Sequence, residues 1–466
     1  MYNQIMNNRK QQFLIIFFLV IIILGLVFLI RNLNGNPIFA GDSFYYDLRV
    51  AEDISLNNYW DSLQGRMHKI TGAHYLLSWM LPVLGLEFLP FISIVLGLIS
   101  AFALFSLLEI FFKDKKIIFI STLLFVLSPI FIYVFTRING YTFALPLLLF
   151  FAYFFTRKKL WSIPLLMIVS FLDPVFFLIS AVIVLLYGIY KKWRYYLAAN
   201  LILSLLSFTT FALFNNSYLS MKIILFNPSI QQILTTFGAR VGVSFFYFFL
   251  SIIGFFTVWQ RKRENTFALI TLLLLLALGI FNSVARLFLN IYFSILAGIL
   301  LAHLFKREWA IDIIKRFTLL LIFCGIIFST AVYMDQLYTA QPTEETVSAL
   351  KYLLSEPQGK VLSHEEYGQM IEYYAGKKVL LDSHSIQADN YDFIKDQQQK
   401  LFYSRNLEQT ENLLYENQVS YIFVTSDMQN GAVWSEEEQG LLFLLENSMR
   451  FEKLYSDEII IWKYLR

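Results

Sequence analysis

Acidic residues cluster in a short stretch that follows the first apolar segment of the chain. Residues 41–54 hold Asp42, Asp47 and Asp53 among aromatic side chains, with Arg49 between them. A carboxylate held close to a bilayer surface can bind a divalent cation or accept a proton from a hydroxyl group. The alternative is a solvated loop with an amphipathic helix that lies on the membrane interface. Both interpretations need the stretch to lie at the edge of a membrane.

Two arginines and one aspartate stand near the ends of later apolar segments: Arg137, Arg286 and Asp173. An arginine fork binds phosphate oxygens bidentately, so an arginine close to lipid suits a phosphorylated lipid. The alternative for Arg286 is a side chain that snorkels to the interface. Asp173 precedes a proline. An acidic residue at membrane depth indicates a functional site, whereas one among the headgroups carries no such meaning.

The composition indicates that most of the chain is not exposed to water. Hydrophobic residues make up 57% of the chain and charged residues 15%, whereas a soluble protein carries about 25% charged residues. The net charge of +3 gives no electrostatic support for nucleic-acid binding. The sequence has no glycine signature of the Walker or Rossmann type, which argues against ATP or a nucleotide sugar as substrate. These features predict a polytopic α-helical membrane protein.

Apolar runs recur from residue 12 to residue 334, and each ends at a basic cluster or a polar break. Since a helix needs about 20 residues to cross the hydrocarbon core, these runs predict about 11 spans. The run 160–172 is short for a full crossing, which leaves a re-entrant segment as the alternative. The predicted spans lie near residues 12–31, 87–112, 117–135, 141–156, 160–172, 174–190, 195–214, 241–259, 266–281, 287–305 and 317–334.

Basic residues predict the orientation of the chain in the cell membrane. Lys and Arg cluster in every second loop, for example at 113–116 and 157–159, whereas the other loops hold scattered charges. Because cytoplasmic loops carry the excess of Lys and Arg, the N-terminus is predicted to be cytoplasmic. The 32–86 loop, the 215–240 loop and everything after Met334 then lie outside the cytoplasm.

The composition changes after residue 341. We predict a soluble extracytoplasmic α/β domain at 341–466 and a multi-span domain at 1–340 that includes the external loop 32–86. Asn406 and Ser435 mark helix starts, because each is followed three residues later by Gln or Glu. The other predicted elements are strands at 359–363, 377–382 and 419–424, a helix at 365–375 and a hairpin at 450–463.

The first external loop carries a resemblance to a known family. The string Gly-Asp-Ser-Phe-Tyr-Tyr-Asp-Leu-Arg at 41–49, followed by Trp-Asp at 60–61 and Gln-Gly-Arg at 64–66, resembles the first external loop of GT-C glycosyltransferases. These polytopic enzymes take a sugar from a polyprenyl-phosphate carrier. The resemblance implies that Asp42 is the catalytic or metal-binding carboxylate. Alignment on the two tyrosines shifts the register by one residue, so Asp47 is the alternative.

A second resemblance lies in the predicted α/β domain. Residues 359–382 resemble the strand–motif–helix–strand of the oligosaccharyltransferase catalytic subunit, which carries Trp-Trp-Asp-Tyr-Gly. Tyr-Gly is kept here, both Trp are absent, and Glu366 stands in place of Asp. The resemblance implies acceptor binding by His364, Glu366 and Tyr367, and the missing Trp argue against protein N-glycosylation. The alternative is an ordinary turn from strand to helix.

A third resemblance concerns the donor and a metal. Arg137-Ile-Asn-Gly140 is similar to the Arg-x-x-Gly of the family, and Arg286 resembles its arginine near the lipid-diphosphate site. The family's next acidic pair is absent from 141–144. The resemblance therefore implies a divalent cation, Mg²⁺ or Mn²⁺, held by Asp42 and Asp173, or else a metal-independent enzyme or an inactive relative.

Together the resemblances imply a membrane glycosyltransferase. Its donor would be a sugar on a polyprenyl phosphate or diphosphate, and its acceptor a protein, lipid or glycan outside the cytoplasm. The alternatives are an inactive GT-C-like scaffold that binds a partner, and a transporter or lipid flippase. Transporters are marked by repeated halves and intramembrane charges, and neither is evident in this sequence.

Overall fold

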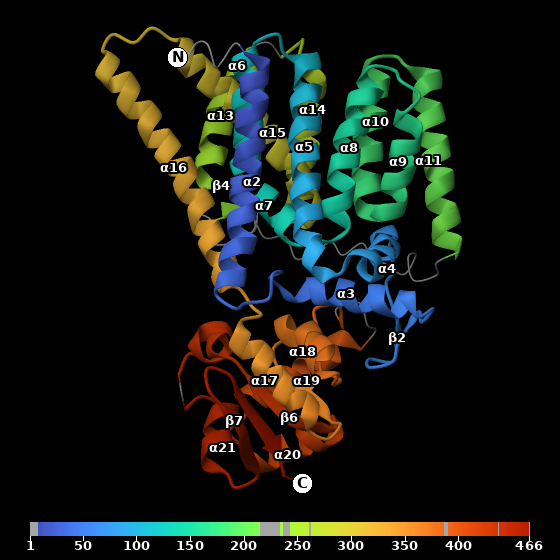
Figure 1. Ribbon diagram of the computed structural model, residues 1–466, viewed down its shortest axis with the longest axis vertical. Helices are drawn as coiled ribbons and strands as arrows, with labels where there is room; N and C mark the ends of the chain where they lie inside the picture. Colours follow the sequence, from blue (N-terminus) through green and yellow to red (C-terminus); the bar gives the residue numbers. More distant parts are fainter. Residues whose placement is uncertain are drawn as a thin grey trace. The chain divides into compact units, whose positions relative to one another are not determined.

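The computed structural model describes residues 8–214, 234–235, 243–260, 262–385, 390–436 and 438–465. The chain divides into two compact units (Figure 1). The helical unit comprises Met1–Ile30 and Ile70–Thr339, and the α/β unit comprises Arg31–Lys69 and Ala340–Arg466. Residues 31–69 thus group with the C-terminal part of the chain, whereas the sequence analysis placed them in the first domain.

The helical unit is built from helices that run in alternating directions (Figure 1). Each predicted span coincides with one of them, except that 117–135 is divided between two. The helices are α2 (Arg9–Leu33), α4 (Gly72–Leu84), α5 (Leu89–Phe111), α6 (Lys115–Leu127), α7 (Pro129–Thr136), α8 (Gly140–Thr156), α9 (Ser162–Leu172), α10 (Pro174–Tyr190), α11 (Arg194–Phe214), α13 (Phe245–Trp259), α14 (Thr266–Phe281), α15 (Ser283–Lys306) and α16 (Asp312–Thr339). A turn of 3₁₀-helix, η1 (Leu86–Phe88), precedes α5, and β3 (Leu234–Thr235) pairs with β4 (Val243–Ser244).

Length separates these helices into two groups. Among the described residues, five segments are long and apolar enough to cross a membrane, and they contain α2, η1 with α5, α11, α15 and α16. The pair α6 and α7 makes a sixth if the 57° bend between them lies within one span. The bend falls at Ser128, which precedes Pro129, and a residue before proline is driven out of the helical region. The remaining apolar helices of 10–17 residues are α8, α9, α10, α13 and α14.

Helix α15 packs closely against its neighbours because glycines remove side chains at the crossings. A Cβ added at Gly298 would lie 2.1 Å from Oγ of Ser121 in α6, and one added at Gly254 in α13 would lie 2.2 Å from the carbonyl oxygen of Leu296. Small residues at such crossings are typical of membrane helices, whose association depends on close packing. The glycines therefore set the positions of α6, α13 and α15.

The α/β unit contains a four-stranded sheet with the order β5-β6-β8-β7. Strands β5 and β6 are parallel, and β8 is antiparallel to both of its neighbours. The predicted strands at 359–363 and 419–424, the hairpin and the Asn406-capped helix are confirmed. The elements are β5 (Lys360–Leu362), β6 (Val419–Val424), β7 (Phe451–Ser456), β8 (Ile460–Tyr464), α17 (Glu344–Ser355), η3 (Glu365–Tyr367), α18 (Gly368–Ala375), α19 (Tyr391–Tyr403), α20 (Leu407–Glu416), η5 (Met428–Ala432) and α21 (Leu441–Asn447).

Two predicted elements of this unit are wrong. Residues 377–382 form no strand of the sheet, because only Val379 bridges to Val361 of β5. The helix predicted to begin at Ser435 begins at Leu441 instead. Gly440 has a φ of +55°, and a Cβ there would lie 2.2 Å from the carbonyl oxygen of Phe402. Only glycine fits such a backbone position, so the chain turns there before the helix starts.

Residues 31–69 join the α/β unit through backbone and side-chain hydrogen bonds. This segment forms α3 (Asp42–Ser55), β1 (Trp60–Asp61) and β2 (Arg66–Met67). The buried Arg31 donates to the carbonyl oxygens of Ala340 and Pro342 at 2.8 and 2.9 Å. The amide of Gly41 donates to the carbonyl oxygen of Gln341 at 2.7 Å. Buried carbonyls need such donors, so these bonds fix where α3 begins.

Replacing Gly298 by Ala should destabilise the helical unit by about 1–3 kcal/mol, because the new methyl group overlaps Ser121. Gly25 in α2 is the matched control, since a Cβ there would meet nothing within 4 Å. Gly25→Ala should leave stability unchanged or raise it slightly, because alanine favours a helix. Thermal unfolding of the purified protein in detergent measures both effects. Equal unfolding temperatures for the two variants would contradict the close crossing of α6 and α15.

Candidate functional site

Asp42 is the first residue of α3 and its carboxylate is buried. Gly41 before it has a φ of +94°, a conformation that glycine adopts without strain. One carboxylate oxygen accepts the amide of Met370 in α18 at 2.9 Å, and the other accepts the hydroxyl of Ser383 at 2.7 Å. Only 8% of Asp42 is exposed. The carboxylate is thus oriented by residues more than 300 positions away in the sequence.

Burial raises the pKa of the Asp42 carboxyl to about 8, although the hydrogen bonds from Ser383 and Met370 act in the opposite direction. The positive end of the helix dipole at the first turn of α3 also favours the charged form. A carboxyl group whose pKa lies close to neutrality can both take up and release a proton under working conditions. Asp42 therefore has the properties of a general base or acid.

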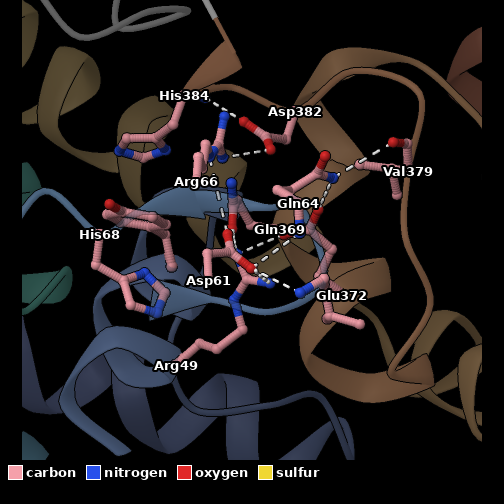
Figure 2. Close-up of polar contacts among 12 residues, drawn as sticks. Arg49, Asp61, Gln64, Arg66, His68, Gln369, Glu372, Val379, Asp382 and His384 are labelled. Atoms are coloured by element: carbon pink, nitrogen blue, oxygen red, sulfur yellow. Dashed lines mark hydrogen bonds and ion pairs between the residues drawn. The ribbon is translucent and has the colours of Figure 1, made fainter. Parts of the chain in front are cut away.

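Arg49 lies on the same face of α3, two helical turns after Asp42. Its guanidinium forms a two-point contact with Asp61, at 3.0 and 3.3 Å, and an ion pair of 2.6 Å with Glu372 of α18 (Figure 2). The same group donates to the amide oxygen of Gln369 at 3.1 Å. Arg49 therefore connects α3, the hairpin of β1 and β2, and α18.

Arg66 makes the second connection between the hairpin and the C-terminal segment. It pairs with Asp382 at 2.6 Å and lies 3.8 Å from Asp61 (Figure 2). Gln64, two residues before Arg66 in the chain, donates to the Glu372 carboxylate and to the carbonyl oxygen of Val379. We name these residues the clasp. The clasp consists of Arg49, Asp61, Gln64, Arg66, Gln369, Glu372 and Asp382.

The clasp buries several charges, and their partners compensate for the loss of water. The side chains of Asp61, Glu372 and Asp382 are 2%, 0% and 0% exposed. Burial raises the pKa of the Glu372 carboxyl to about 8, while Arg49 opposes this shift. Removing one member of a buried pair typically costs about 3–5 kcal/mol, because the remaining charge has no partner. The arrangement therefore specifies one position for α3 against α18.

Structural comparison finds the same architecture in an archaeal enzyme. The oligosaccharyltransferase from Archaeoglobus fulgidus in the apo form matches with a TM-score of 0.61 over 93% of this chain and 71% of the other, at 14% identity. The AglB protein from the same organism, in complex with an inhibitory peptide and a dolichol-phosphate, matches with a TM-score of 0.61 over 96% and 73%, at 14% identity. The chain has the GT-C fold. The resemblance found in the sequence is thereby confirmed for the fold.

A third solved structure of the Archaeoglobus fulgidus oligosaccharyltransferase, a complex with Zn and sulfate, matches with a TM-score of 0.59 over 95% of this chain and 71% of that one, at 14% identity. No protein-family model and no curated protein sequence matches the chain. The GT-C fold therefore rests on the arrangement of the elements, with little support from sequence identity.

Asp47, the alternative carboxylate, is only half-buried on α3. Its neighbour Tyr46 stacks on the ring of His384 at 3.8 Å, and Asp53 contacts His68 at 2.7 Å. Five residues separate Asp47 from Asp42, so the two project from different faces of the helix. Asp42 alone of this pair faces α18 and Ser383, which favours it over Asp47 for a role at this site.

The predicted acceptor-binding residues lie at the turn from β5 to α18. His364 caps the 3₁₀ turn by accepting the amide of Glu366 at 3.4 Å, and the hydroxyl of the buried Tyr367 donates to Asp427 at 3.1 Å. Gly368 allows α18 to approach Asp382, since a Cβ there would lie 2.6 Å from that residue. These contacts support a structural role for Tyr-Gly. Glu366 is exposed. Acceptor binding by His364, Glu366 and Tyr367 stays a prediction.

Three predicted residues of this GT-C fold lie at helix ends of the helical unit. Arg137 follows α7 and lies 5.0 Å from the ring centre of Tyr133. Asp173 caps α10 by accepting the amide of Phe176 at 2.7 Å. Arg286 in the first turn of α15 donates to the carbonyl oxygen of Gly279 at 2.9 Å. Because successive helices run in opposite directions, these three junctions lie at one end of the unit.

The side chains do not gather as a metal site requires. In the part of the chain that the structure describes, no three His, Cys, Asp or Glu side chains form a group that could hold a metal ion. Asp42 belongs to the α/β unit and Asp173 to the helical unit, where it caps a helix. A cation held by Asp42 and Asp173 stays a prediction, and no catalytic step is assigned to one. The 215–240 loop is largely outside the described residues.

Sequence reasoning missed most of the site on the C-terminal side. Gln369, Glu372 and Asp382 lie in the stretch 359–382 that carries the second resemblance, and Ser383 follows it, but only the tertiary contacts show what these residues do. One weak signal was available. Asp382 follows the apolar run Val-Leu-Leu at 379–381, and polar residues at the ends of such buried runs are frequent in binding sites.

The stability of the α/β unit should fall as the pH rises from about 4 to about 8. The folded state holds a proton on Asp42 up to a pH of about 8, whereas the unfolded chain releases it near the ordinary aspartate pKa of 3.8. Folding therefore binds a proton in this interval, and raising the pH opposes folding. Asp42→Asn should flatten the dependence of the unfolding temperature on pH. A slope in Asp42→Asn as steep as in the wild type would show that Asp42 does not carry this proton.

Proposed function

We propose that the protein is a membrane glycosyltransferase that transfers a sugar from a polyprenyl-phosphate or polyprenyl-diphosphate carrier to an acceptor outside the cytoplasm. The observation that carries the proposal is the buried carboxylate of Asp42, which accepts a hydroxyl group at 2.7 Å. The GT-C fold supports it. A solved structure with this fold holds a dolichol-phosphate and an inhibitory peptide.

In the proposed reaction, Asp42 acts as the general base. An acceptor hydroxyl takes the place that the Ser383 hydroxyl occupies at 2.7 Å from the carboxylate. Its proton moves to Asp42 while its oxygen bonds to the anomeric carbon of the sugar. The bond from that carbon to the phosphate oxygen breaks, and the electron pair leaves with the lipid phosphate. Only the ionised form of Asp42 accepts this proton, and with a pKa of about 8 that form grows as the pH rises towards 8. The raised pKa makes the ionised carboxylate a stronger base.

Arg137 and Arg286 are the proposed donor-binding residues of the helical unit. Both stand at helix ends, where Arg286 donates from its Nε to the carbonyl oxygen of Gly279. Fixed positive groups near a leaving phosphate stabilise the charge that develops on it. The α14–α15 junction would then bind the phosphate of the lipid carrier.

We also propose that all 11 apolar segments lie in the membrane, with a cytoplasmic N-terminus. The predicted topology places both the 32–86 loop and the residues after Met334 outside the cytoplasm. Residues 31–69 and 340–466 pack into a single unit, which two segments on opposite sides of a membrane could not do. The charge pattern and the packing are separate observations, and both support placing these two segments on the same side of the membrane.

One observation favours a second candidate, a catalytically inactive scaffold. Both oxygens of Asp42 already have partners within the α/β unit, and the described residues form no metal site. A protein of this kind would use its extracytoplasmic unit to bind a partner. It would retain donor or acceptor binding without turnover, and the activity measurement below distinguishes the two functions.

Asp42→Asn should reduce sugar transfer by ~10²–10⁴-fold, because an amide cannot accept the proton of the acceptor. Asp47→Asn is the matched control on the same helix and should retain activity. The measurement is transfer of labelled sugar by membranes that contain each variant, with thermal unfolding as a check on folding. If Asp47→Asn loses activity and Asp42→Asn does not, the base is Asp47. If neither loses activity, the assignment of a base to α3 is wrong.

A reporter that is active only in the cytoplasm should be silent when fused after Arg466. The same reporter fused before the first residue should be active, which controls for expression and insertion. Fluorescence of both fusions in intact cells measures the topology. Activity of the C-terminal fusion would place the α/β unit in the cytoplasm and overturn the proposed orientation.

A further inference from the structure

A polar cavity opens in the α/β unit at the start of strands β5 and β6. Its volume is about 590 Å³, which lies within the range of about 300–1,000 Å³ that is usual for ligand sites. The described residues that line it bring cationic, amide, hydroxyl and aromatic groups together. The side chains are those of Lys360, Lys378, Gln358, Gln418, Ser420 and Tyr415. None of these belongs to the clasp or to the proposed transfer site.

Two backbone features stand at the wall of the cavity. Gly359 lies tightly against β6, where a Cβ would come within 2.6 Å of the Cβ of Ser420, so only a residue without a side chain fits there. Gln418 has a φ of +57°, in the left-handed region that residues with a Cβ seldom adopt. Strained residues of this kind are often found at binding sites. The strain lies directly at the wall of the cavity.

The two lysines place positive charge side by side in the cavity. The bridge between Val361 and Val379 sets Lys360 beside Lys378, and the amide of Val361 donates to the carbonyl oxygen of Lys378 at 2.8 Å. Burial, together with the charge of Lys378, lowers the pKa of Lys360. Neither ammonium forms an ion pair within the described part of the chain, although Glu416 also lines the cavity. An anion would relieve the repulsion between the lysines.

We propose that this cavity binds an acidic saccharide, a sugar that carries a carboxylate or a phosphate. The paired lysines fit the anionic group, and charge-assisted hydrogen bonds of this kind are the strongest available to a ligand. Gln358, Gln418 and Ser420 offer both donors and acceptors, which sugar hydroxyls require. Tyr415 adds an exposed aromatic face with a hydroxyl at its end. Binding at this place does not depend on the proposed transfer reaction.

The test is calorimetric titration of the purified full-length protein with glucuronate and glucose 6-phosphate. Glucose and inorganic phosphate serve as comparison ligands that lack the charge or the sugar. Both acidic sugars should bind, and each more tightly than either comparison ligand. The double substitution Lys360→Gln and Lys378→Gln should weaken binding by ~10-fold or more, as expected when charged hydrogen bonds are lost. Lys351→Gln, at an exposed lysine of α17 outside the cavity, should change nothing.

The pH dependence of ligand binding is a second test of the same site. Binding should weaken as the pH rises through the lowered pKa of Lys360, because the ammonium loses its charge. The proposal is overturned if no acidic sugar binds more tightly than glucose, or if the double variant binds as well as Lys351→Gln. Inorganic phosphate that binds as tightly as glucose 6-phosphate, with no binding of glucuronate, would make this a simple phosphate site and would also overturn it.

Discussion

The ion pairs of Arg49 with Asp61 and Glu372 are the contacts on which the α/β unit depends. They join residues 31–69 to a helix that begins more than 300 positions later. Charges removed from water are costly unless every one has a partner, so such a group tolerates only one arrangement. The sheet and its helices provide the apolar core of this unit. The clasp determines where residues 31–69 sit against this core.

The position of Asp42 follows from that arrangement. Its carboxylate lies two turns before Arg49 on the same face of α3, so the clasp brings it to the amide of Met370. Burial there gives the carboxyl a pKa of about 8, a value that an exposed loop carboxylate would not have. The catalytic group of the proposed reaction thus owes its basicity to a domain that the sequence separates from it.

The helices were predictable because the bilayer imposes a local signal on the sequence. Long apolar runs, their basic ends and Pro129 are all read over about 20 residues. Strand β6 and the Asn406 cap were likewise found from short patterns. Arg49 and Glu372 each stand in a stretch that carries a family resemblance, but no local signal shows that the two residues pair. The glycine at position 440 could not be explained from the local sequence either, because the residue that leaves no room for a side chain there is the distant Phe402.

The site could be predicted in part for the same reason. Asp42 was found through its position after the first span, where a family resemblance added to the residue type. Its partners Met370 and Ser383 were missed, since a backbone amide has no identity in a sequence and the serine stands in an unremarkable turn. The predicted metal site rests on residue type alone. Asp173 has the residue type of a ligand, but the structure uses it to cap α10.

A double-mutant cycle on Arg49 and Glu372 tests the clasp most directly. Unfolding of the full-length protein would be measured for Arg49→Met, Glu372→Gln and the double variant, at a pH above 8 where Glu372 is ionised. Each single substitution should cost up to about 3–5 kcal/mol, because it removes one partner from a buried charge, although Arg49 keeps Asp61 when Glu372 is replaced. The double variant should be more stable than the sum of the single losses predicts, by about 1–3 kcal/mol. Single losses that add to within about 0.5 kcal/mol would show that the two residues do not interact, and would contradict the account.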